Sequence, residues 1–184
     1  QRGVLEASLG DQQGAYRDLK TALRLSPSAG ETHDLRLSFA EAALATFHPK
    51  DALDALTPLG TAPGFDVWIQ RGRALQTMKD DRDAETAFAK AGNVARTPDE
   101  HEVVIAAQIE LLKAEGRNSE ARAVFTSSRN GDALGILDDV KLAYLAMQAG
   151  DDRVAGRAFE PARQKGELRG TQLTHAAYLA PRHY

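Results

Sequence analysis

Histidine and cysteine are the side chains that most often hold metals or supply nucleophiles, and this chain of 184 residues has five histidines and no cysteine. Without cysteine, disulfides, thiol nucleophiles and Cys-based zinc sites are excluded. A helical metal site also needs a second histidine three or four residues away on the same face. None of the five has one: they are His33, His48, His101, His175 and His183. We interpret them as isolated side chains, with His48 capping the helix that follows it.

Three pairs of adjacent aspartates offer the other chemistry that carboxylates support, which is general acid and base catalysis of hydrolysis. They are Asp80-Asp81, Asp138-Asp139 and Asp151-Asp152. Each pair precedes an apolar periodic run, where a carboxylate can accept hydrogen bonds from the free N–H groups of a first helical turn. Capping explains them without catalysis. We predict a protein that is not an enzyme and has no cofactor and no metal site.

Helices must position all of these side chains, because apolar residues recur at three- and four-residue steps along most of the chain. The first helices of successive pairs are predicted over 31–47, 66–78, 99–114 and 137–149. The second helices are predicted over 11–25, 49–59, 81–95, 118–127 and 151–165, and 173–180 begins a further pair. No extended alternating run with hairpin turn residues supports a strand. The predicted fold class is all-α.

The breaks between these helices carry cap residues. Gly10-Asp11, Asp80-Asp81 and Gly150-Asp151 place a glycine or aspartate where one helix is expected to stop and an aspartate where the next starts. Pro49 suits a first helical position, and Thr97 with Glu100 predicts a capping box. Two stretches rich in turn formers, 61–64 and 127–132, are expected to be looser.

Composition restricts the partners. The formal net charge is −3, from 23 basic and 26 acidic side chains without a basic block, so the charge pattern of a nucleic-acid-binding protein is missing. No apolar run approaches the roughly 20 residues that span a bilayer, and we expect no membrane insertion by this segment. Because the chain begins at Gln1 inside a repeat, we interpret it as a piece of a longer protein, with periplasm and cytoplasm both open.

A pattern of small and aromatic residues recurs five times, and its clearest copy contains Trp68, Gly72, Leu75, Ala84 and Phe88. The first small residues of the second helices lie 32 to 37 residues apart: Ala15, Ala52, Ala84, Ala121 and Ala155. Over essentially its whole length the chain resembles the tetratricopeptide repeat family, whose period is about 34 residues and whose signature has these residue types. The copies depart from that signature at Arg36, Arg71 and Ile109.

The resemblance implies a right-handed α-solenoid of antiparallel helix pairs. It implies one array over 1–184, with repeats at about 1–29, 30–64, 65–98, 99–134 and 135–168 and a partial repeat at 169–184. Small residues such as Gly72 and Ala84 would let paired helices approach, and Phe88, Phe125 and Phe159 would fill the space between layers. Trp68 occupies the repeat's own tryptophan place, so we expect it to pack.

The resemblance further implies a concave surface, lined by the first helices, that binds a protein or peptide. Projecting the family's inward-facing places onto this sequence gives Asp34, Leu37, Glu41, Ile69, Arg73, Gln76, Glu110, Lys113, Tyr144, Met147 and Gln148. Arg73, Lys113, Tyr144 and Met147 are the expected anchors. Chaperone-binding members carry lysine and asparagine where Leu37/Glu41 and Ile69/Arg73 stand here, which disfavours a clamp for a terminal carboxylate.

Three roles are open for such a scaffold. The first is non-catalytic binding of a protein or peptide. The second is the periplasmic arm of a bacterial outer-membrane protein that secretes exopolysaccharide or adsorbs phage, and the third is a regulatory or recruiting segment of a multidomain enzyme or transcription regulator. An upstream signal peptide and downstream amphipathic strands would support the second; a catalytic or helix-turn-helix domain would support the third. Uncapped ends of the array could also associate with a second copy.

Overall fold

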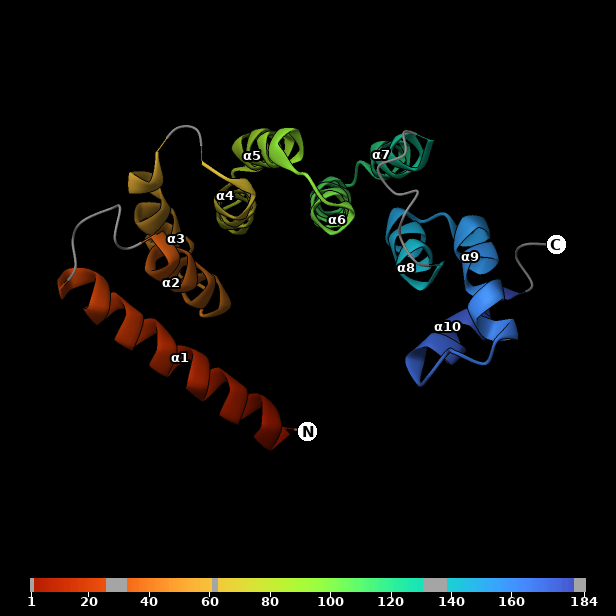
Figure 1. Cartoon of the computed structure of the whole chain (residues 1–184), viewed down its shortest axis with the longest axis horizontal. Coiled ribbons are helices and arrows are strands. Elements are labelled where there is room, and N and C mark those ends of the chain that lie inside the picture. The colour runs from red at the N-terminus through yellow and green to blue at the C-terminus, as the bar shows by residue number, and fades with distance from the viewer. Residues whose placement is uncertain (1, 26–32, 61–62, 131–138, 181–184) are drawn as a thin grey trace. The chain divides into compact units, whose positions relative to one another are not determined.

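The computed structural model describes residues 2–25, 33–60, 63–130 and 139–180, and Figure 1 shows them as a succession of helices. No strand occurs within these ranges. The predicted all-α fold class is therefore confirmed. The chain divides into two compact units, Gln1–Ala95 and Arg96–Tyr184.

The first unit contains α1 (Arg2–Leu25), α2 (His33–Ala45), α3 (Pro49–Leu56), the short 3₁₀ segment η1 (Thr57–Leu59), α4 (Phe65–Thr77) and α5 (Asp81–Val94). Helices that follow one another pack together, α2 on α3 and α4 on α5, and α1 packs on α2. In addition, α2 packs on α4. The first helices of two successive pairs are therefore neighbours.

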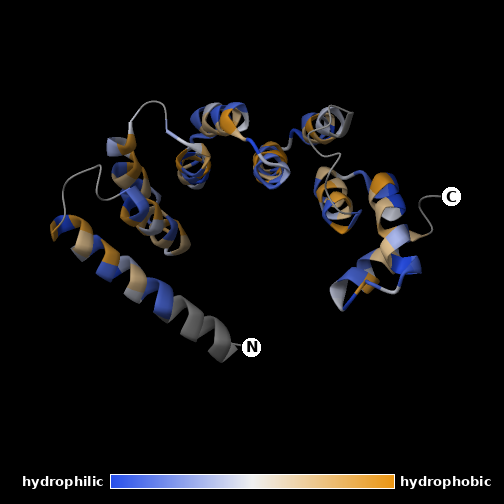
Figure 2. Ribbon diagram, in the orientation of Figure 1, coloured by the Kyte–Doolittle hydropathy of each residue, from blue (hydrophilic) through white to orange (hydrophobic). Residues whose placement is uncertain are grey.

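The second unit contains α6 (Pro98–Ala114), α7 (Asn118–Asn130), α8 (Asp139–Ala149), α9 (Asp152–Gln164) and α10 (Thr171–Leu179). Its packing repeats that of the first unit, with α6 on α7, α8 on α9 and α6 on α8, and α10 packs on α9. Figure 2 shows apolar and polar residues interleaved along the helices of both units, as expected of helices that bury one stripe and expose another.

Alanine and phenylalanine fill the contacts between paired helices. Phe88, Phe125 and Phe159 are among the largest fully buried side chains, as predicted. The alanines four residues before them are fully buried as well: Ala84, Ala121 and Ala155. The first copy differs, because Ala15 is exposed and its neighbour Tyr16 is buried. The Tyr16 ring stacks on Phe39, so in α1 an aromatic side chain takes the place that alanine fills elsewhere.

Gly72 marks the closest approach of α4 to α5. A Cβ atom at Gly72 would lie within 3.0 Å of three atoms of the Phe88 ring, a separation that real Cβ atoms essentially never show. The Phe88 ring therefore lies directly against the backbone of α4. Only glycine leaves room for it, which accounts for the glycine of the clearest repeat copy.

One type of turn ends the first helix of every pair from α2 to α8. One or two residues after the helix end, the backbone enters the left-handed region, at Phe47, Lys79, Gly116 and Gly150. The N–H of the next residue donates to a carbonyl five residues earlier, as in His48 N to Ala43 O at 2.7 Å and Arg117 N to Leu112 O at 2.8 Å. This is the Schellman motif, which glycine favours because a Cβ atom is strained there. Two of the four turns therefore carry strain.

The predicted caps have mixed outcomes. Pro49 stands at a helix start, Thr97 and Glu100 form the capping box, and the Asp151 carboxylate accepts from Val154 N at 3.1 Å, all as predicted. His48 and Asp80 precede helices but make no side-chain cap, so the capping role of His48 was wrong. The His48 ring instead stacks on Tyr16, and its Nδ1 lies 3.1 Å from Oγ1 of Thr46.

Two predicted breaks are helical. The helix α1 runs through Gly10-Asp11, because a single glycine in a helix interior costs only about 1 kcal/mol and no proline interrupts the run. The stretch 127–130 belongs to α7, where the Ser128 hydroxyl donates to Val124 O at 2.8 Å. The remainder of the second stretch, 131–132, lies outside the described residues, as do 61–62.

Replacing Gly72 with alanine should destabilise the first unit. The added methyl group must displace the Phe88 ring, and overpacking of this kind costs about 1–3 kcal/mol. Urea unfolding measures the loss, and adding Phe88→Leu should recover part of it in a double-mutant cycle. Gly14→Ala is the matched control: a Cβ there meets nothing within 4 Å, so stability should rise by about 0.5–1 kcal/mol. Equal effects at both glycines would contradict the close contact.

Replacing Phe47 or Lys79 with glycine should stabilise the protein. The left-handed conformation costs an L-residue about 1–2 kcal/mol, and the entropy of glycine offsets roughly half of that gain. We expect a net increase of about 0.5–1 kcal/mol in the free energy of unfolding. The reverse change, Gly116→Ala, places a Cβ in open space at a φ of 77° and should destabilise through the backbone alone. A loss of stability in both Phe47→Gly and Lys79→Gly would show that the backbone is not strained at these two turns.

Candidate binding surfaces

The predicted groove residues of the first unit lie on α2 and α4, but they differ in accessibility. Asp34 and Arg73 are exposed, while Leu37 and Gln76 are half-buried and Leu37 packs against the core. Ile69 is only 3% exposed. It has almost no surface to offer a ligand, so the structure removes it from the predicted surface. The sequence projection could not show this, because Ile69 is covered by neighbours that only the tertiary structure supplies.

A hydrogen bond joins the same two helices. Nε2 of Gln70 donates to Oε1 of Glu41 at 3.1 Å, and Gln70 is only 6% exposed. A buried amide without a partner is costly, so this bond stabilises the contact of α2 with α4. Glu41 was predicted as a ligand-binding residue; the structure gives its carboxylate an internal role as well.

In the second unit, polar side chains also connect the first helices of two pairs. Nζ of Lys113 on α6 donates to the backbone carbonyl of Gln148 on α8 at 2.7 Å. Near the other end of α6, Nζ of Lys141 lies 2.8 Å from Asp99 and 3.1 Å from Glu102. The structure thus brings together Lys113 and Gln148, two residues of the predicted surface. Glu110 is exposed on the same helix as Lys113.

Tyr144 and Met147 are half-buried against the core of the second unit. The Tyr144 ring meets Phe159 edge-on, with centroids 5.5 Å apart, and meets His175 in the same way at 5.7 Å. These contacts reach α9 and α10. Tyr144 therefore packs inside the second unit. Only the accessible part of its ring could contact a ligand, in contrast to the free anchor that was predicted.

Trp68 is half-buried, and two cations lie close to its ring. The Arg71 guanidinium is 5.0 Å and Nζ of Lys90 is 4.6 Å from its ring, a geometry that favours cation–π attraction. Arg71 also donates to Leu56 O at 2.9 Å and Gly60 O at 3.0 Å. Arg71 therefore satisfies carbonyls at the end of α3 and η1.

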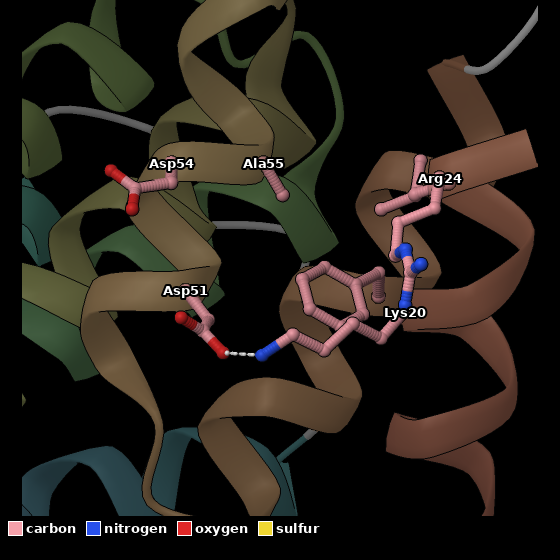
Figure 3. A pocket seen from close by; sticks show the side chains of 7 residues that line it. Lys20, Arg24, Asp51, Asp54 and Ala55 are labelled. Atoms are coloured by element: carbon pink, nitrogen blue, oxygen red, sulfur yellow. Dashed lines mark hydrogen bonds and ion pairs between the residues drawn. The ribbon is translucent and has the colours of Figure 1, made fainter. Parts of the chain in front are cut away.

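A pocket that was not predicted from the sequence lies in the first unit, between α1, α2 and α3. Its cavity volume is about 240 Å³. Lys20, Leu23 and Arg24 of α1, Phe39 of α2, and Asp51, Asp54 and Ala55 of α3 line it. Figure 3 shows Lys20 and Arg24 extending from one helix and Asp51, Asp54 and Ala55 lying along another. We call it the α1–α3 pocket. The four-residue step from Tyr16 to Lys20 and on to Arg24 was the available signal, because it places three polar groups on one helical face.

A polar bridge closes one side of the α1–α3 pocket. Nζ of Lys20 lies 2.8 Å from Oδ2 of Asp51 and 2.9 Å from the Tyr16 hydroxyl, which itself donates to the same carboxylate oxygen. The Tyr16 ring stacks on His48, with centroids 4.5 Å apart. The bridge joins α1 to α3. It makes Asp51 the common acceptor of two polar groups of α1.

The bridge shifts the titration of both charged groups. Hydrogen bonds from Lys20 and then Tyr16 hold the pKa of Asp51 below its ordinary value of 3.8. Hydrogen bonds to Asp51 and Tyr16 raise the pKa of Lys20 above its ordinary value of 10.5. Both shifts favour the charged forms, so the bridge is fully formed between about pH 4 and pH 10.

Metal and membrane chemistry find no structural support in the described part of the chain. No group of three or more histidine, cysteine, aspartate or glutamate side chains there could hold a metal ion. None of the helices formed by the same residues combines the length and the apolar character that a membrane span requires.

Comparisons with protein-family models, curated proteins and solved structures find no match to this chain. The roles of its residues consequently rest on their own geometry. In the first unit the candidate binding surfaces are the exposed face of α2 and α4 and the α1–α3 pocket. In the second unit the candidate binding surface is formed by the exposed residues of α6 and α8.

Acid should weaken the contribution of Asp51 to stability. Because the folded-state pKa is lowered, the contribution is present above the unfolded value of about 3.9 and is lost as pH falls through the folded value. At pH 7 we expect Asp51→Asn to cost about 1 kcal/mol, a modest amount because Lys20 is half-exposed. Urea unfolding should show this difference as constant from about pH 5 to 9 and shrinking below about pH 4.

Asp54→Asn on the same helix is the control for that measurement. We expect it to change stability by less than about 0.5 kcal/mol, as surface substitutions usually do. A difference between wild type and Asp51→Asn that stays constant down to about pH 2 would contradict the bridge.

Proposed function

We propose that this chain is a non-catalytic scaffold of the tetratricopeptide type, in which the helix pairs stack as a right-handed solenoid and bind a protein or peptide. The observation that carries the proposal is the recurrence of one structural unit. The buried alanine of the second helix, the buried leucine or phenylalanine four residues after it, and the left-handed turn after the first helix return from pair to pair. A protein built from such copies uses its repeated residues for packing, so binding specificity resides in the residues that differ between copies.

The proposed binding residues are the exposed members of the predicted surface. In the first unit these are Asp34, Glu41 and Arg73, and in the second unit Glu110, Lys113 and Gln148. Arginine is enriched among residues that dominate binding energy, because its planar guanidinium donates several hydrogen bonds. We therefore assign the leading role in the first unit to Arg73.

A peptide-display selection against the purified chain tests this function whatever the sequence of the natural partner. We expect enrichment of peptides that bind wild type, and about tenfold weaker binding to Arg73→Glu, the effect of losing one hot-spot residue. Arg82→Glu, on the exposed side of α5, is the matched control and should bind as wild type does. Fluorescence anisotropy with the selected peptides measures the affinities.

Two results would count against the proposal. One is a selection that enriches no peptide above the level obtained with an unrelated helical protein. The other is equal weakening by Arg73→Glu and Arg82→Glu, which would indicate a general charge effect in place of a binding surface on α4.

A further inference from the structure

The same four residue types follow one another at two places in the second unit. They are Ala143-Tyr144-Leu145-Ala146 in α8 and Ala177-Tyr178-Leu179-Ala180 at the end of α10. Leu145 and Leu179, which occupy the same place in the two quartets, are both buried in the core of the second unit. The helix α10 therefore packs on its own unit in the manner of a first helix, as α8 does.

The first alanine of the quartet has a different environment in the two helices. Ala143 is fully buried, whereas Ala177 is exposed. Ala143 lies seven positions before the left-handed residue that follows its helix. That place is buried in each earlier first helix as well, where it is occupied by Ala40, Gly72 or Ile109. On α4 a ring of the second helix α5 lies directly against it, so Ala177 stands where a second helix is expected.

Ala177 belongs to an apolar ridge along α10. Leu173 is 51% exposed and lies one turn before it, and Ala180 lies at the helix end. Residues at spacings of three and four along a helix form the ridge that packs against a neighbouring helix. In α8 the alanines at these places, Ala143 and Ala146, are both fully buried. Because Leu173 and Ala177 are exposed, none of the described helices covers the same ridge of α10.

The second helices of the chain show what kind of partner such a ridge accepts. Both α5 and α9 have the pattern Ala-x-x-Ala-Phe-x-x-Ala, at 84–91 and 155–162, and its four named residues are buried in each helix. Phe159 of α9 meets Tyr144 of α8 edge-on, with ring centroids 5.5 Å apart. Since α10 repeats the quartet that contains Tyr144, it complements a helix of the same pattern.

The sequence after α10 favours a covering helix that comes from another protein. Pro181 stands four residues after Ala177, at a place that is helical in the earlier first helices. It is occupied there by Leu44, Gln76, Lys113 and Met147, and the left-handed residue follows three positions later. Proline has no N–H to donate a helical hydrogen bond at this place. The residue pattern of the tight turn that joins the earlier pairs is therefore not repeated after α10.

We propose that the ridge of Leu173, Ala177 and Ala180 is a docking site for an amphipathic helix of a partner protein with the pattern Ala-x-x-Ala-Phe-x-x-Ala. The partner helix lies on α10 as α9 lies on α8, with its phenylalanine against Ala177 and edge-on to Tyr178. The anchors of such a helix recur at three- and four-residue steps, as in other helices that bind a groove. This inference goes beyond the surface proposed above and does not depend on it, since it rests on the comparison of α10 with α8.

A terminally blocked peptide with the sequence of residues 80–95 tests the docking site, because it contains the pattern of α5 and no proline. NMR follows its titration into the ¹⁵N-labelled chain. We expect saturable shifts of the Leu173 and Ala177 amides. Phe88→Ala in the peptide should weaken binding about tenfold, the effect of losing one hot-spot residue.

Two variants of the chain test the ridge itself. Leu173→Glu and Ala177→Glu each place a charge in the apolar contact and should abolish saturation. Both positions are exposed, so circular dichroism should show unchanged helicity. Thr171→Glu is the matched control: it adds the same charge at an exposed position on the side of α10 away from the ridge, and it should bind the peptide as wild type does.

Three results would overturn this inference. The first is a peptide that causes no saturable shift on α10, and the second is equal weakening by Ala177→Glu and Thr171→Glu. The third is association of the chain with itself in sedimentation experiments that Leu173→Glu abolishes, because a second copy would then be the occupant. The proposed function is judged separately, by the loss of affinity of display-selected peptides for Arg73→Glu, and it stands or falls whatever happens at α10.

Discussion

Close packing around a buried phenylalanine ring is the constraint on which the helix pairs α4–α5, α6–α7 and α8–α9 depend. At Gly72 on α4 the Phe88 ring leaves no space for even a methyl group, and on the second helices alanine fills the buried places four residues before each phenylalanine, at Ala84, Ala121 and Ala155. Packing at this distance fixes the residue types at the crossing points and excludes polar groups from them. The residues that define the repeat are therefore poor candidates for binding, and chemical variety is confined to the outer faces of the helices.

The turns impose a second constraint, which is local and costs less. Each of the four first helices is followed by a residue in the left-handed conformation. At two of these four places the residue is not glycine, although only glycine adopts this conformation without strain. Phe47 is the clearer case, because its ring is 80% exposed and gains little from burial. The turn is retained because its hydrogen bonds satisfy the last carbonyls of the helix and let the chain reverse at once into the next helix. The geometry of the pair thus outweighs the local preference of the residue.

Most of the helices could be predicted from sequence, since apolar periodicity and cap residues act within a few positions along the chain. The starts at Pro49 and Thr97 show this, and the failure at Gly10-Asp11 shows its limit, because a turn-forming pair does not end a helix that is otherwise continuous. The surface was harder to predict. The periodicity of α4 gives the side on which Ile69 lies, but the neighbours that bury it come from other parts of the chain.

The α1–α3 pocket lies where the repeat pattern fails, and that failure explains why it is open. In the later copies the marker alanine is buried, with a buried leucine or phenylalanine four residues on, but in α1 the marker Ala15 is exposed and Tyr16 is buried in its place. The longer reach of Tyr16 and Lys20 to Asp51 joins α1 to α3 through side chains. A polar bridge of this length holds the two helices without filling the space beside it. The space left over has apolar walls and two charges outside the bridge, which are the properties that make a pocket selective.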